Sequence, residues 1–106
     1  MGSGQTVLNK AITFATAATH EIIAAVAGKK IKIANLMLTV SGETNLTLKS
    51  NTTAISGPLD FGGTDEPRGM VQNFGNFPLE TVAGEAFNIT SSGAVQLSGY
   101  ATYFTE

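Results

Sequence analysis

The sequence predicts an all-β protein, an antiparallel β-sandwich of the jelly-roll type with about seven or eight short strands. Apolar and polar residues alternate in several short segments, which is the period of a strand that buries one face. Turn-forming residues separate these segments at intervals of about 8–12 residues, as in sandwiches and small barrels. No segment sustains the helical period.

The chain of 106 residues is predicted to form one domain, because a chain of this length buries only one core. Residues 1–10 contain few apolar side chains, so we expect a flexible N-terminal arm there and a single sandwich domain over 11–106. Met1–Gly4 is either a native part of that arm or a remnant of expression. Ala11–Phe14 alternates like a first strand.

The segment His20–Ala27 permits two interpretations. It is a two-turn helix capped by Thr19 and stopped by Gly28, or a short strand that runs into a turn over 27–29. So short a helix would stand alone in a β-rich chain, and we therefore favour the strand.

The best-specified stretch surrounds the loop Ser41–Glu43. Apolar side chains occupy even-numbered positions on both sides of this loop. A loop of three residues would pair Leu38 with Leu46 and Leu36 with Leu48, which places apolar side chains opposite one another. The sequence therefore predicts a β-hairpin over 30–50.

An irregularity precedes this hairpin. Ile31 and Ile33 stand on odd positions, so the buried face changes parity near Ala34-Asn35. The change indicates either a β-bulge or a segment buried on both faces, and we favour the bulge.

The second half begins with the β-prone segment Thr52–Ile55, followed by a loop, Leu59–Gly69, that carries four charged residues. Met70–Phe74 and Pro78–Val82 are predicted short strands. We expect a solvated loop at Leu59–Gly69, because the spacing of its acidic residues matches no calcium-binding pattern. Those acidic residues are Asp60, Asp65 and Glu66.

A second hairpin is predicted around Ser91–Gly93. Its register would pair Ile89 with Val95 and Phe87 with Leu97. Glycine as the last loop residue suits a left-handed conformation, and a β-branched residue at Gly93 should therefore destabilise the domain.

The composition excludes several classes of function. Without cysteine there is no disulfide, thiolate metal site or cysteine nucleophile. A net charge of −2 attracts neither nucleic acid nor anionic lipid. The longest apolar run, Ile22–Ala27, is too short to cross a membrane. Charged residues are only 13% of the chain, which indicates a nearly neutral surface.

Candidate catalytic groups are few, and we predict that the protein is not an enzyme and has no cofactor. His20 is the only histidine, and Glu21 beside it in a strand would point to the opposite face. Glu80 and Glu85 flank four residues that are typical of an ordinary tight turn.

Aromatic residues suggest a sugar-stacking platform as an alternative to burial in the core. The residues concerned are Phe61, Phe74, Phe77 and Tyr100. The chain has no tryptophan, and phenylalanine in an all-β domain usually belongs to the core, which we therefore favour.

The segment 70–79 is the predicted subunit interface. It is apolar and uncharged, and its glycine and proline prevent it from being one regular core strand. The apolar side chains that we expect there are Met70, Val71, Phe74, Phe77 and Leu79. A closed cyclic homo-oligomer would bury this patch without forming filaments.

Over residues 20–104 the chain resembles small all-β virion proteins of tailed bacteriophages. The resemblance lies in Thr53–Leu59, Leu79–Thr90 and Gly99–Tyr103. It implies a role in the virion as a capsid decoration (cement) protein that binds the major capsid protein or other virion proteins, stabilises the head and forms a homotrimer. The alternative is a tail or fibre component that acts as a glycan- or receptor-binding module.

Overall fold

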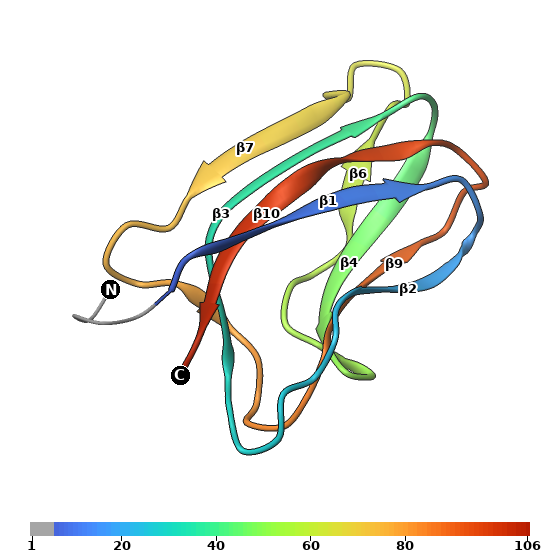
Figure 1. Cartoon of the computed structure of the whole chain (residues 1–106). Coiled ribbons are helices and arrows are strands. Elements are labelled where there is room, and N and C mark those ends of the chain that lie inside the picture. Colours follow the sequence, from blue (N-terminus) through green and yellow to red (C-terminus); the bar gives the residue numbers. More distant parts are fainter. Residues whose placement is uncertain (1–5) are drawn as a thin grey trace.

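The computed structural model describes residues 6–106, which form two antiparallel five-stranded sheets packed face to face (Figure 1). The predicted β-sandwich is therefore confirmed. Sheet A contains β1 (Leu8–Phe14), β10 (Leu97–Thr105), β3 (Ile31–Val40), β7 (Gly69–Asn73) and β8 (Leu79–Glu80). Sheet B contains β2 (Ala18–Ile23), β9 (Phe87–Ser91), β4 (Thr44–Ser50), β5 (Thr53–Ala54) and β6 (Leu59–Phe61).

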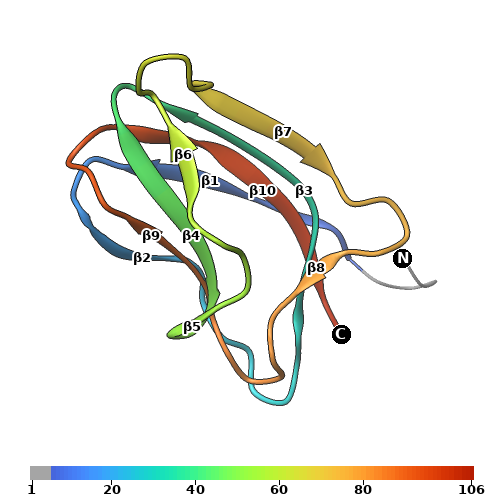
Figure 2. The same ribbon diagram turned by 180° about the vertical axis from the view of Figure 1, so that it is seen from behind.

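The second half of the chain pairs with the first half in reverse order. Going outward from the middle of the chain, β6 pairs with β4, β7 with β3, β9 with β2 and β10 with β1 (Figure 2). Two further pairings join these pairs into sheets, because β10 also pairs with β3 and β9 with β4. The two halves of the chain therefore pair like the two arms of one long hairpin, and successive pairs alternate between the two sheets.

The core lies between the sheets and receives alternate side chains from each. In β4, every second residue from Thr44 to Ser50 is buried, and the residues between them are half-buried. The largest fully buried side chains are Phe87, Ile12, Ile22, Ile31, Ile33, Leu36, Leu38, Leu46, Ile89 and Leu97. Period-two alternation in the sequence therefore identified the inward faces correctly.

The predicted hairpin around Ser41–Glu43 is wrong, because β3 lies in sheet A and β4 in sheet B. The loop leads from sheet A to sheet B, and the backbone hydrogen bonds at its start go to segments that are distant in the sequence. The amide of Val40 donates to the carbonyl of Arg68 (2.9 Å) and the amide of Ser41 to that of Gln96 (3.0 Å). Leu38 and Leu46 thus share the core without pairing in one sheet.

The second predicted hairpin, around Ser91–Gly93, is also wrong, because β9 belongs to sheet B and β10 to sheet A. The amide of Ser92 donates to the carbonyl of Asn45, and that of Gly93 donates to the Thr44 hydroxyl, both at 3.0 Å. Gly93 is not among the residues with positive φ. It is nevertheless closely packed, because a Cβ there would lie 2.6 Å from the carbonyl oxygen of Glu43.

The bulge before residue 36 is confirmed. In the pairing of β10 with β3, Thr102 faces Asn35 and Tyr103 faces Ile33, so Ala34 has no opposite residue. The strand interpretation of His20–Ala27 is also confirmed, since β2 ends at Ile23 and a turn follows in which Gly28 has φ of 71°.

The N-terminal boundary lies earlier than predicted. Leu8 already faces Tyr103 across the sheet, so residues 8–10 of the expected arm belong to β1. Their backbone bonds to β10 compensate for the few apolar side chains there. Residues 1–5 of that arm lie outside the described residues.

Candidate interaction surface

The outward side of sheet A is the most distinctive surface of the molecule. Twelve outward residues on β1, β10, β3 and β7 form three rows of directly opposed neighbours, which together we call the sheet A face. The central row is Ala11, Tyr100, Met37 and Val71. The flanking rows are Thr13, Ser98, Thr39 and Gly69, and Asn9, Thr102, Asn35 and Asn73.

None of these twelve residues is charged, and none is buried. Val71 is 76% exposed and Tyr100 41% exposed, although both are large apolar side chains. The flanking rows supply hydroxyl and amide groups, and Thr102 already donates to the Asn9 side chain (2.7 Å). The sheet A face is therefore an exposed apolar row between two neutral polar rows.

Charged residues border the sheet A face at both ends. At one end, Arg68 donates to the carbonyl of Ser41 (2.9 Å). At the other end, the Lys32 ammonium lies 2.8 Å from the Glu80 carboxylate, and Lys30 lies 3.4 Å from it. The hydrogen bond from Lys32 lowers the pKa of Glu80 below its ordinary value, and the same contact raises the pKa of Lys32.

The outward side of sheet B has a different character. Its central row is Thr19, Thr90 and Thr47, with the first two hydroxyls 2.7 Å apart. The neighbouring rows carry Glu21, Lys49 and Asp60.

The five predicted interface residues do not form one patch. Met70, Phe74 and Leu79 are partly buried and pack against the core. Val71 and Phe77 are exposed, Phe77 to 87%, at the edge strand β7 and in the turn after it. Of the predicted set, only Val71 belongs to the sheet A face.

His20 has a structural role. Its ring stacks on Phe14 at a centroid distance of 4.2 Å, and its Nε2–H donates to the carbonyl of Thr16 (2.8 Å). A carbonyl only accepts, so this nitrogen carries the proton. Glu21 is exposed on the opposite side of β2, as predicted.

Glu80 and Glu85 engage separate partners. Glu80 binds the two lysines at the border of the sheet A face, whereas Glu85 accepts a hydrogen bond of 2.6 Å from the buried Ser50 hydroxyl. The expected turn between them is present, with the amide of Glu85 donating to the carbonyl of Val82 (3.1 Å).

The predicted loop Leu59–Gly69 is wrong at its start, because Leu59–Phe61 forms β6 and places Asp60 on the outward side of sheet B. Asp60 accepts a hydrogen bond from the Asn45 amide (2.7 Å), and Glu66 accepts one from the backbone amide of Gly63 (2.9 Å). Within residues 6–106, no group of three histidine, cysteine, aspartate or glutamate side chains is arranged to hold a metal ion.

The aromatic platform does not assemble. Phe61 is buried in the core from sheet B, whereas Tyr100 lies on the outward side of sheet A. Phe74 packs against the core, and Phe77 projects alone from its turn. The preference for core phenylalanines is thus confirmed for Phe61 and Phe74.

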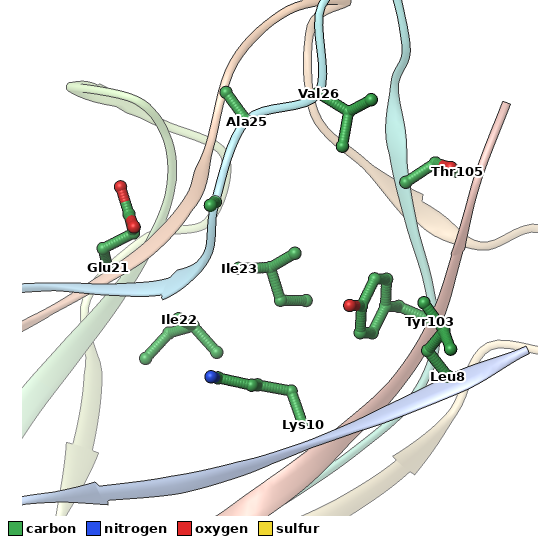
Figure 3. Close-up of a pocket in the computed structure, with 10 residues that line it drawn as sticks. Leu8, Lys10, Glu21, Ile22, Ile23, Ala25, Val26, Tyr103 and Thr105 are labelled. Atoms are coloured by element: carbon green, nitrogen blue, oxygen red, sulfur yellow. The ribbon is translucent and has the colours of Figure 1, made fainter.

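A pocket of about 430 Å³ lies on the side of the sandwich where the edge strands β1 and β2 meet. Its walls are largely apolar, including Leu8, Ile23 and Tyr103. Figure 3 shows Lys10 reaching from β1 towards Ile22, with the Glu21 carboxylate pointing away from it. An inward-pointing charge of this kind discourages pairing at a sheet edge.

No protein-family model matches the chain, and neither does any curated protein. In the part of the chain that the structure describes, no helix has the length and apolar character needed to span a membrane.

Proposed function

We propose that this chain is a non-enzymatic structural protein of a phage particle, a capsid decoration protein that binds the major capsid protein and stabilises the head. The observation that carries the proposal is the sheet A face. It is an exposed apolar row within a neutral surface that is bordered by charged residues. Protein interfaces have this anatomy of an apolar centre and a polar rim.

We also propose that the sandwich is a jelly roll, and the strand order supports this. A jelly roll is a double sheet built from two Greek keys, and viral capsid domains use it repeatedly. The reverse pairing of the two halves of the chain is the arrangement expected of such a fold. Fold alone does not determine function, so the proposal depends on the surface and on the sequence resemblance.

A glycan-binding module at a tail is the second candidate, and Tyr100 is the observation that favours it. This aromatic ring is exposed between hydroxyl and amide side chains, such as Thr102 and Asn35. It lacks the companion rings that a stacking platform needs.

Mass spectrometry and binding to particles test the proposal together. We expect the chain in purified particles at many copies per particle, and we expect purified chain to bind particles that lack it. Met37→Glu should abolish this binding, whereas Thr47→Glu, on the outward side of sheet B, should leave it intact. If the chain is absent from particles, or present at only a few copies, the decoration role is contradicted. If the chain binds a glycan array and Tyr100→Ala abolishes that binding, the second candidate is supported.

A further inference from the structure

We infer that a second copy of this chain packs on the sheet A face, so that the face forms the contact between subunits. This inference rests on the proposed function only in taking the face as a contact surface. It assigns that surface to the contact between copies, so that Met37→Glu prevents particle binding by preventing the assembly of the subunits. It replaces the segment 70–79 as the centre of the interface, because three of the five predicted residues there already pack against the core.

The absence of charge on the sheet A face favours a second copy as its partner. An unpaired charge is costly to bury, so a partner for the sheet A face must present a neutral surface. The outward side of sheet B does not meet this requirement, since it carries Glu21, Lys49 and Asp60. The sheet A face does meet it, because its twelve residues include no charge. Two copies joined through this face bury no ionised group at its centre.

The rows of the sheet A face follow the order polar, apolar and polar. When one copy is turned over onto another about an axis in the plane of the sheet, the apolar rows meet and the polar rows meet. Serine, threonine and asparagine carry both donors and acceptors, so like rows can bond to each other. The face is therefore complementary to itself, as contacts between identical subunits often are.

The area of the sheet A face determines how far the contact between copies must extend. Four strands about 4.8 Å apart and five residues of about 3.4 Å each cover about 300 Å² in projection. A stable interface buries about 800 Å² on each partner, so the contact must extend beyond the flat face. Val71 already belongs to the face, on its edge strand β7. Phe77, which is 87% exposed in the turn that follows β7, supplies further apolar surface outside the twelve residues.

Light scattering and sedimentation velocity on the full chain test this inference. We expect the wild type to have about twice the mass of one 11.0 kDa chain, because a contact in which the same face meets itself closes at two copies. A trimer, the number that the resemblance implies, would contradict this arrangement. Tyr100→Glu should raise the dissociation constant at least about 100-fold, because it places an unpaired charge in the contact. The control Thr47→Glu places the same charge on sheet B and should leave the mass unchanged.

Circular dichroism and the melting temperature show whether each variant is folded. If Tyr100→Glu does not fold, Thr39→Glu, in a flanking row of the same face, takes its place. A monomeric wild type, or an oligomer that both face variants leave intact, overturns the inference. The two proposals can fail separately. If the wild type is monomeric and Met37→Glu still abolishes its binding to particles, only the self-association is overturned. If the wild type is an oligomer that Tyr100→Glu dissociates, but it never binds particles, only the proposed function is overturned.

Discussion

The outward side of sheet A carries no charged side chain over twelve residues, whereas that of sheet B carries three charges around a row of threonines. The inward sides, by contrast, are alike, since both are lined by leucine, isoleucine and phenylalanine. Folding requires only the inward sides to be apolar. The fold therefore does not require the difference between the outward sides. Tyr100 and Val71 are large and exposed on sheet A, and they belong to the surface that we propose a partner covers.

The largest expected effect comes from Gly99, which lies in β10 at the centre of sheet A. Its φ is 151°, and a Cβ there would collide with the carbonyl oxygen of Met37. Gly99→Ala should lower the free energy of unfolding by about 3 kcal/mol, because backbone strain and overlap add. Urea denaturation measures this. The control Gly57→Ala, with no atom within 4 Å of the new Cβ, should change little, and equal stability of both variants would contradict the pairing of β10 with β3.

A smaller effect is expected at Gly93, where the chain passes from sheet B to sheet A. Gly93→Val should lower the free energy of unfolding by about 2 kcal/mol, since its Cβ would crowd the carbonyl oxygen of Glu43 at 2.6 Å and the Thr44 side chain at 3.2 Å. The reason is overlap with these neighbours. Unchanged thermal unfolding of Gly93→Val would show that this connection is packed differently.

Removing the charges from sheet B tests whether charge alone distinguishes the two outward sides. The triple variant Glu21→Gln, Lys49→Gln and Asp60→Asn should change the free energy of unfolding by less than about 1 kcal/mol, because exposed charges contribute little. We expect its oligomeric state to match the wild type, since the central row of sheet B is made of threonines. New, larger assemblies in light scattering would mean that charge alone distinguishes the two sides.

The smallest effect concerns the lysine contacts at the border of the sheet A face. The hydrogen bond from Lys32 lowers the pKa of Glu80 below 4.5, so this contact stabilises the fold above pH 4.5 and is lost as the pH falls through the lowered value. The wild type should therefore be slightly more stable than Glu80→Gln at about pH 6, and the difference should shrink as the pH falls below 4.5 and through the lowered pKa of Glu80. A series of denaturation midpoints from about pH 6 downwards measures it. A difference that does not change with pH would show that charge is not its cause.

The strands and their inward faces could be predicted from the sequence, but their partners could not. Even-numbered apolar positions on both sides of Ser41–Glu43 fit a hairpin, and they fit a connection across the core equally well. The separation is about 4.8 Å in the first case and about 10 Å in the second, and a three-residue loop permits both. Whether the loop forms a hairpin or a connection across the core depends on residues that are distant in the sequence. The carbonyls of Arg68 and Gln96 accept hydrogen bonds from the amides of Val40 and Ser41.

The candidate surface was predicted only in part for a related reason. Val71 was identified because it belongs to an apolar, uncharged segment. Tyr100, Met37 and Ala11 stand in separate segments, and only the register of the strands brings them into one row. A signal was present in the outward positions of β3 and β10, which are neutral from residue 35 to 39 and from 98 to 102.

The nested pairing of the strands has a consequence for biosynthesis. Strands β1 to β4 occupy the first fifty residues, and none of them pairs with another. Each of them pairs with a strand that is translated later. Leu8, for example, pairs with Tyr103, which lies near the other end of the given sequence. Such distant pairing folds slowly and leaves strand edges exposed meanwhile. A ribosome that has made half of this chain therefore holds four strands without a sheet, and the sandwich assembles only once β9 and β10 have emerged.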